Sequence, residues 1–396
     1  MELSTSTTPR PQWRIVPYPG LEGLQQLRED WQRLTEQLPF QSAFHSYAAM
    51  EAYLRHLCPS PETFTCFALT DGQAIRAICP LERSTQRLFG ARVTVWKFSR
   101  HAHWSIADAI CPQGEVRQCL VRHLVNHLRA TEGTASLLEI GPVADYSALL
   151  DGLTALGAHE YCTDVMWQSS VIDCRQPFAE IEASLTKTAR QSRRRAHKRL
   201  AKLDDVAWVR ASSGAALDAE FESFLSVEAS GWKGPQGTGT AVACHPELVA
   251  YYRDLIHAMA ETGDCDIFSL YAEGRCIASQ IDVKGREECV ALKAGYDESY
   301  SVVTPGKLVD EAMIEHCCGD ASSGRINFLT EIEWLRGWNA TTVPVTQTHV
   351  SITRVRGRLL VALFHLQRLV RAAALRYRER TARRDQARGR KPAGKN

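Results

Sequence analysis

The stretch "ALKAGYDESYSVVTPGKLVDEAMIEHCC", from Ala291 to Cys318, decides the fold. It predicts a strand, a loop and a helix, with the tetrapeptide "TPGK" (304–307) where the helix begins. Proline pre-sets the backbone for a turn or a first helical residue, so this junction can simply be the turn at which the helix starts. It can also bind an anion, because a helix N-terminus presents free N–H groups and glycine lets a phosphate come close.

An internal repeat at an offset of about 200 residues surrounds this stretch. The segment "SAFHSYAAMEAYLRHLCP" near Ser42 is echoed by "AVACHPELVAYYRDLIHAM" near Ala241, and "FALTDGQAIRAICPL" from Phe67 is echoed by "FSLYAEGRCIASQIDV" from Phe268. Each member of the second pair predicts a hairpin around a glycine turn. The sequence therefore predicts two copies of one unit.

Both copies continue in the same order after the hairpin. A further strand follows ("VTVWKF" and "CVALKA"), then a loop, a helix ("EVRQCLVRHLVNHL" and "GKLVDEAMIEHC") and another strand ("SLLEIG" and "RINFLT"). Alternation of helices with apolar strands predicts the α/β class, with a mixed sheet in each unit.

Composition limits the function classes. The chain has 396 residues, 44% hydrophobic and 23% charged, and its 13 cysteines form no C-x-x-C pair. We expect reduced, buried thiols and no metal site. The sequence has no apolar run of about 18 residues and no signal-peptide core in "MELSTSTTPRPQ", so we expect no membrane span and a cytoplasmic location. It also lacks the GxxxxGK[ST], GxGxxG, HExxH and GxSxG motifs.

Two segments are strongly basic. "SLTKTARQSRRRAHKRLAKL", from Ser184 to Leu203, has eight Lys/Arg and no acid, and it predicts a helix with a narrow apolar seam. The tail from Arg371 to Asn396 has ten Lys/Arg against two acids, and we expect it to be disordered. The tail can serve solubility alone, or these segments can bind nucleic acid or another anionic surface.

The order of elements resembles that of the GNAT acetyltransferase superfamily. The motifs "EASGWKG" (228–234), "LKAGYDESYSVVTPGKLV" and "INFLTEIEWLRGW" resemble those of the CelD/BioF2-like group, which is related to the FemAB transferases. The resemblance covers roughly residues 184–366, and the N-terminal half more loosely. It implies two tandem GNAT-like units, with the start of the helix at 304–307 as the phosphate cradle of an acyl-CoA.

The resemblance sets the expected domain boundaries. We expect a disordered N-terminus (1–12), an N-terminal GNAT-like unit without cofactor (13–180), a basic linker helix (181–205), a C-terminal acyltransferase unit (206–370) and the basic tail (371–396). The loop "HAHWS" (101–105) of the first unit lacks the "TPGK" context, so that unit is expected to shape the acceptor cleft.

The resemblance also assigns roles to residues. Lys293 lies in an apolar strand, where its charge needs a carboxylate, a phosphate or solvent. A carboxylate can accept the acceptor's proton and a phenol can protonate the leaving thiolate. The expected cofactor-binding residues are Lys293, Thr304, Pro305, Gly306 and Lys307; the expected catalytic residues are Glu331, Glu333, Tyr296 and Tyr300; the expected substrate-binding residues are Trp232, Lys233, Trp334 and Arg336. Each also has a purely structural alternative, as core aromatic or surface charge.

Three functions follow from the resemblance. The first is acyl transfer from an acyl-CoA to an amine or hydroxyl of a small molecule or glycan, in polysaccharide or cell-envelope metabolism. The second is a FemAB-like transfer from aminoacyl-tRNA. The third is a non-catalytic binding protein. It is favoured by two departures from the family pattern: Thr330 replaces the usual glycine and Leu335 the usual lysine.

Overall fold

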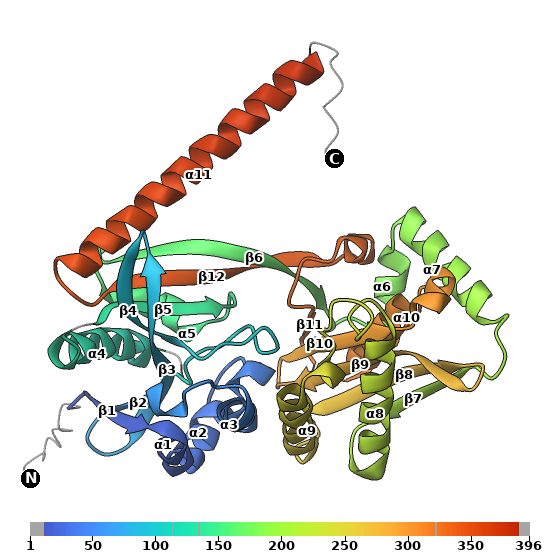
Figure 1. The fold of residues 1–396 in the computed structure, drawn as a ribbon, viewed down its shortest axis with the longest axis horizontal. Helices are drawn as coiled ribbons and strands as arrows, with labels where there is room; N and C mark the ends of the chain where they lie inside the picture. Colours follow the sequence, from blue (N-terminus) through green and yellow to red (C-terminus); the bar gives the residue numbers. More distant parts are fainter. Residues whose placement is uncertain (1–11, 113, 134, 321–322, 388–396) are drawn as a thin grey trace, which may run out of the picture.

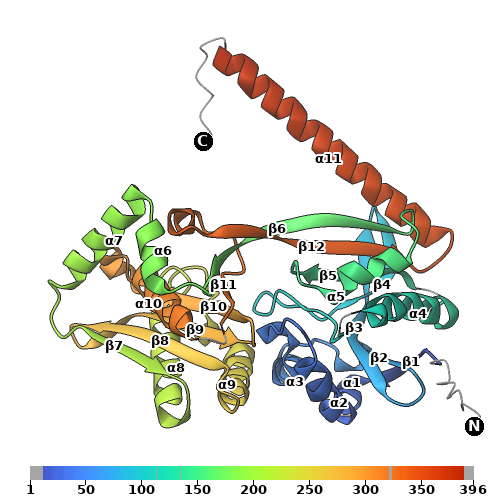
Figure 2. The ribbon, with the colours of Figure 1, turned by 180° about the vertical axis from the view of Figure 1, so that it is seen from behind.

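The computed structural model describes residues 12–112, 114–133, 135–320 and 323–387. Two mixed α/β halves lie side by side, and one long helix projects beyond them (Figure 1; Figure 2 from behind). The strands are β1 Arg14–Pro19, β2 Phe64–Thr70, β3 Ile75–Leu88, β4 Ala91–Phe98, β5 Ala135–Val143, β6 Tyr161–Asp173, β7 Ala207–Ala211, β8 Cys265–Ala272, β9 Arg275–Lys284, β10 Glu288–Tyr296, β11 Arg325–Asn327 and β12 Thr341–Ser351. The α-helices are α1 Gly20–Gln26, α2 Arg28–Glu36, α3 Tyr47–His56, α4 Glu115–Thr131, α5 Ala148–Gly152, α6 Phe178–Ser184, α7 Lys187–Leu200, α8 Gly214–Ser230, α9 Pro246–Ala260, α10 Pro305–Gly319 and α11 Arg356–Ala387.

All twelve strands form one sheet with a pseudo-twofold order. The order is β1-β2-β3-β4-β5-β12-β6-β11-β10-β9-β8-β7, so β1 to β5 correspond to β7 to β11 when it is followed from the other edge. The pairing repeats as well, because β4 is parallel to β5 and β10 is parallel to β11, whereas the outer strands are antiparallel. The predicted α/β class with two tandem units is confirmed.

The halves exchange their last strands. In the chain β6 follows β5, but it pairs with β11; β12 follows β11, but it pairs with β5. At the centre β6 and β12 pair with each other, from Thr341↔Val171 to Val350↔Tyr161. Each half therefore completes its sheet with a strand of the other half.

Helices cover both faces of the sheet. Strand β2 packs against helices on both faces. Cys66 and Ala68 belong to the hydrophobic cluster that contains α1, α2 and α3, whereas Phe67 and Leu69 belong to the cluster that contains α4. This alternation is that of a strand buried on both sides. The first cluster also contains Tyr251 of α9 and residues of α8, so a single core extends under both halves.

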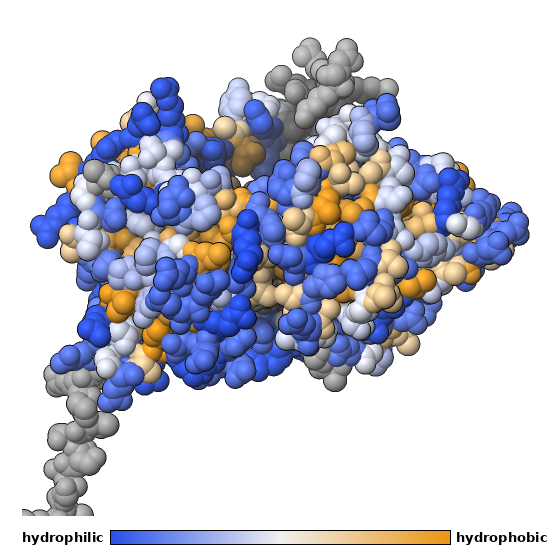
Figure 3. Space-filling view, turned by 60° about the horizontal axis from the view of Figure 1, so that its bottom comes forward, coloured by the Kyte–Doolittle hydropathy of each residue, from blue (hydrophilic) through white to orange (hydrophobic). Residues whose placement is uncertain are grey.

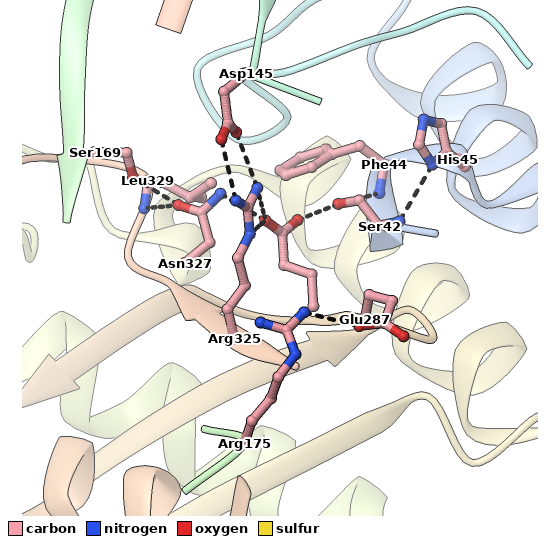
Figure 4. Close-up of polar contacts among 11 residues, drawn as sticks. Ser42, Phe44, His45, Asp145, Ser169, Arg175, Glu287, Arg325, Asn327 and Leu329 are labelled. Atoms are coloured by element: carbon pink, nitrogen blue, oxygen red, sulfur yellow. Dashed lines mark hydrogen bonds and ion pairs between the residues drawn. The ribbon is translucent and has the colours of Figure 1, made fainter. Parts of the chain in front are cut away.

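A buried polar network also joins the halves (Figure 4). The Glu288 carboxylate of β10 has no exposed surface, and it accepts hydrogen bonds from Arg325 Nε at 3.0 Å, from Asn327 Nδ2 at 3.1 Å and from the Ser42 hydroxyl of the other half. The Arg325 guanidinium also binds Asp145 at 3.0 Å. Because each buried charge has partners from both halves, separating the halves would leave it unpaired.

Several elements differ from the prediction. The first strand of each half, β1 and β7, was not predicted. The basic segment 184–203 is the predicted helix, α7, preceded by the short α6. Residues 371–387 continue helix α11, where disorder was expected. The expectations for residues 1–11 and 388–396 lie outside the described residues.

Candidate functional site

The predicted cradle lies where α10 begins. Strand β10 is followed by the 3-10 helix η5 (Glu298–Val303), and Thr304 then takes the left-handed conformation with φ 55° and ψ 54°. Its carbonyl accepts the Lys307 N–H at 3.0 Å. Pro305 occupies the first helical position and has no N–H to satisfy. Among the described groups, the Gly306 N–H has no hydrogen-bond acceptor, so it can donate to a ligand.

A pocket of about 310 Å³ opens beside this helix start. Its walls come from the N-terminal part of α7, from the first turns of α10 and from η6 (Glu333–Trp338). Its lining residues are Thr186, Thr188, Ala189, Ser192, Arg193, Ala196, Thr304, Lys307, Leu308, Glu311, Glu333, Trp334, Gly337 and Trp338. We call it the α7–α10 pocket. Hydroxyls, two basic side chains and two indole rings suit a ligand with phosphates and a flat ring.

The two basic side chains of the α7–α10 pocket differ in their partners. Arg193 binds the buried Glu311 at 2.7 Å and also pairs with Glu182, so its charge is already neutralised. Lys307 forms no ion pair within the described residues, and its ammonium lies 5.3 Å from the centre of the Trp334 ring. Lys307 is therefore the cation that remains available to an anionic ligand.

A second, small pocket lies on the other side of the α10 start. It measures about 30 Å³ and is lined by Glu228, Gly231, Trp232, Lys233, Ala294, Gly295, Tyr296 and Glu298. A Cβ atom on Gly306 would lie 3.3 Å from the Tyr296 ring. Gly306 thus lies against Tyr296, which lines the small pocket, and precedes Lys307, which lines the α7–α10 pocket.

A buried carboxylate organises the small pocket. Glu228 of α8 is 2% exposed and accepts the Val242 N–H at 2.9 Å. The ammonium groups of Lys233 and Lys293 both lie 3.3 Å from its Oε1 atom. Burial lowers the pKa of Lys293, and the charge of Glu228 opposes this effect. Lys293 thus finds the carboxylate that its apolar strand required.

The N-terminal half contributes an imidazole nearby. His103 Nδ1 lies 3.0 Å from the Tyr252 hydroxyl of α9. Burial, with a smaller contribution from the charge of Lys293, lowers the pKa of His103 to about 3. The ring is therefore neutral at physiological pH and can accept or donate a hydrogen bond.

Strand β10 has an open edge at this point. Its ladder with β11 covers only Glu288 to Val290, and its register with β9 shifts between Ala291 and Lys293. From residue 291 to 296 no described strand pairs with this edge of β10. Its backbone groups can therefore hydrogen-bond a ligand. The Ala294 carbonyl, for example, accepts a hydrogen bond from the Lys233 ammonium at 3.1 Å.

The structure brings most of the predicted residues into two groups. The α7–α10 pocket collects Thr304, Lys307, Glu333 and Trp334; the small pocket collects Trp232, Lys233, Tyr296 and, through Glu228, Lys293. Pro305 is buried, and Gly306 lies against the Tyr296 ring.

Three predicted residues point elsewhere. The Tyr300 hydroxyl lies 2.5 Å from Glu273 and 3.0 Å from Arg275, in the β8–β9 turn, and the bond to Glu273 raises the pKa of Tyr300. Glu331 pairs with Arg336 at 2.5 Å on the surface. Neither Glu331 nor Arg336 lines the α7–α10 pocket.

Sequence reasoning missed several residues of this region. They are Glu228, His103, Thr188, Ser192 and Arg193. Glu228 had a detectable signal, because it is an acid on the apolar face formed by Phe221, Phe224 and Leu225 in α8. The residues of α7 had none, since a basic helix is typical of a solvated surface.

Comparisons with known proteins agree with this geometry. Residues 187–337 match the family described as acetyltransferase (GNAT) domain, and this range contains the lining residues of both pockets except Thr186 and Trp338. None of the curated proteins compared with the chain matches its sequence.

Solved structures extend the likeness to most of the chain. FemX superposes with a TM-score of 0.56 at 9% identity, over 81% of this chain and 95% of FemX. A conserved protein of unknown function from Bacteroides thetaiotaomicron has a TM-score of 0.50 at 11% identity, over 82% of this chain and 97% of its own. A domain described as the C-terminal domain of a lysylphosphatidylglycerol synthetase from Agrobacterium fabrum has a TM-score of 0.50 at 11% identity. The match covers 85% of this chain and 95% of that domain. Residues 187–337 are thus similar to a GNAT acetyltransferase domain, and most of the chain has a fold like that of FemX.

Proposed function

We propose that this chain transfers an acyl group from an acyl-CoA to an amine or hydroxyl. The observation that carries the proposal is the α7–α10 pocket at the start of α10, where Lys307 has no ion-pair partner among the described residues. Its volume of about 310 Å³ is at the lower end of the usual range for small-molecule sites. A helix N-terminus and a free lysine supply the charge that a diphosphate requires.

The donor would extend from one pocket to the other. Its phosphates would contact Lys307, Thr304 and the Gly306 N–H in the α7–α10 pocket, and Trp334 offers a flat surface for a ring. Its acyl end would pass Gly306 toward the edge of β10 and the small pocket. Trp232 and Lys233 would then border the acceptor, which we propose to be a small molecule or glycan of polysaccharide or cell-envelope metabolism.

The reaction is a direct attack on the thioester. The acceptor's nitrogen or oxygen forms a bond to the carbonyl carbon, a base takes its proton, and the carbon–sulfur bond breaks as the thiolate leaves and is protonated. We propose Glu333 as base, acting through water because it lines the α7–α10 pocket, whereas Glu331 is held by Arg336. We propose Tyr296 as acid, because Tyr300 is bound to Glu273. A backbone N–H at the β10 edge would stabilise the oxyanion.

Binding of CoA tests the donor site. Lys307→Glu replaces the free cation with an anion, and we expect it to weaken CoA binding at least tenfold in calorimetry because the phosphates are then repelled. Lys198→Glu is the matched control, since Lys198 is an exposed lysine of α7 that does not line the pocket. Equal affinity of the two variants would place the donor elsewhere.

The second candidate is a donor linked to RNA, as in the FemAB resemblance. It is favoured by α7, which borders the α7–α10 pocket and carries basic residues along the helix. Binding of aminoacyl-tRNA that falls steeply with salt, without affinity for CoA, would select this candidate. Tight CoA binding without turnover on any acceptor in a panel would instead support a non-catalytic protein.

A further inference from the structure

Helix α11 carries a line of exposed apolar side chains. Leu359, Leu366, Leu369, Val370 and Tyr377 are 60%, 56%, 64%, 59% and 69% exposed. With Ala362 and Ala373 they recur every three to four residues, which places them on one side of the helix. On the face of the body in Figure 3, by contrast, hydrophilic residues separate the hydrophobic ones into patches.

This exposed line is not the side that holds α11 to the protein. Leu360, Val361 and Phe364 are buried and pack on the sheet, in one cluster with residues of β4, β5 and β6. At 100° per residue the exposed line lies roughly opposite them. It therefore faces away from the body and is free to meet another surface.

Most of α11 extends beyond its support. A helix of 32 residues is about 48 Å long. The last side-chain contacts with the body come from His365 and Arg368, which lie 3.0 and 3.1 Å from carbonyls of β6. Figures 1 and 2 show the remainder of the helix projecting away from the sheet.

The projecting part is strongly basic. Between residues 356 and 381 the sequence has seven arginines and one acid, Glu379. Arg371, Arg376, Arg378 and Arg380 form no hydrogen bond or ion pair through their side chains among the described residues. Helical spacing places Arg376 and Arg380 at one border of the apolar line. It places Arg371 and Arg378 on the opposite side of the helix. Long arginine side chains can reach past an apolar face to charges at its border.

We propose that α11 docks this protein on an anionic lipid surface, with the apolar line inserted at the interface and the arginines bound to lipid phosphates. A second copy of the helix fits less well, because a helix pair would oppose arginines beside the seam, and the two acids of each helix cannot neutralise its nine arginines. Nucleic acid would use the arginines but leave the apolar line in water. No described helix is long and apolar enough to cross a membrane, so the proposed contact is peripheral.

Co-sedimentation of the full chain with vesicles tests the proposal. We expect binding to vesicles of phosphatidylglycerol and phosphatidylcholine, and at least tenfold weaker binding to phosphatidylcholine alone. Replacing Arg376 and Arg380, which flank the apolar line, with Gln should lower the partition coefficient roughly 25-fold, at about fivefold for each charge near the surface. CoA affinity should not change, since no residue of α11 lines either pocket.

A matched pair of variants tests the apolar line. Leu366→Glu introduces an acid on the line, whereas Leu375→Glu introduces the same acid on the opposite side, at a residue that is 58% exposed. We expect the first to lose binding at least tenfold and the second at most about threefold. Equal losses, equal binding to neutral vesicles, or a dimer in solution that Leu366→Glu dissociates without any vesicle binding would each overturn the proposal.

Discussion

At the scale of single residues, the two glutamates after β11 have different surroundings. Glu333 borders the α7–α10 pocket, whereas Glu331 is tied to Arg336 on the surface. If Glu333 is the base, Glu333→Gln should lower kcat by about 10²–10⁴-fold and leave CoA affinity unchanged. Glu331→Gln is the matched control and should stay within a few-fold of the parent. Release of free CoA measures both, and a large loss in Glu331→Gln alone would reverse the assignment.

Asp282 of β9 predicts a dependence of stability on pH. Its side chain is fully buried, Oδ1 accepts a hydrogen bond from Gln280 at 2.8 Å, and Oδ2 has no partner among the described groups. Burial raises the pKa of Asp282 well above its usual value, and nearby Asp266 adds to the shift. Because the folded state keeps this proton after the unfolded chain has lost it at about pH 4, the free energy of unfolding should fall as pH rises from there.

Asp282→Asn should remove this slope. The amide cannot ionise, so at pH 8 the variant should be more stable than the parent by about 1–2 kcal/mol, with the difference shrinking toward pH 4. Urea unfolding at several pH values measures it, with Asp204→Asn in an exposed loop as the control that leaves the slope unchanged. The free energy of unfolding of the parent protein could instead rise between pH 5 and 8, in step with that of the Asn variant. That result would show that Asp282 is ionised in the folded protein.

The sequence predicted residues better than it predicted their partners. The need of Lys293 for a carboxylate followed from its apolar strand, but the identity of Glu228 did not, since α8 is distant in the chain. The start of α10 was predictable because proline and glycine act locally. Tyr300 shows the limit: a phenol in a loop before the helix can face either way, and here it faces Glu273.

At the scale of elements, the strongly periodic segments were predicted and the edges were not. Strands β2, β3, β8 and β9 are buried on both faces over much of their length, and α4 and α10 are amphipathic, so each has a clear local pattern. The outer strands β1 and β7 are short and partly exposed, and they contain polar residues or proline. Such edge strands carry little periodicity, because only one neighbour and part of one face constrain them.

Helix α11 was misjudged for a different reason. Its basic composition is typical of disordered tails, but alanine, arginine and leucine are also strong helix formers, and the anchored residues 357–364 start the helix. Once a first turn is held by packing, each further residue adds one hydrogen bond at low cost. Composition alone cannot distinguish these outcomes, whereas the packed residues at one end can.

At the scale of the whole molecule, the exchange of β6 and β12 could not be predicted from the sequence. Both segments are strands of similar length that follow a shorter strand, so either could pair with β5 or with β11. Local sequence sets the faces of a strand, but the choice of neighbour depends on contacts across the chain. The expected boundaries at 13–180 and 206–370 therefore stay a prediction. They describe two copies of one unit, not two parts that fold independently.

The exchange does predict how fragments behave. A fragment of residues 206–370 lacks β6, which separates β11 from β12, and it also lacks Ile172, Ile181 and Leu185 of the core around α10. Two strand edges and part of a core would be open to water, and the buried Glu288 would lose Ser42. We expect this fragment to aggregate or to unfold without a cooperative transition in urea.

Co-expressed fragments 1–204 and 205–396, in contrast, should copurify as one complex, because each supplies the other's missing strand and only an exposed loop is cut. A fragment 206–370 that is monomeric and unfolds as cooperatively as the full chain would show that the halves do not depend on the exchanged strands.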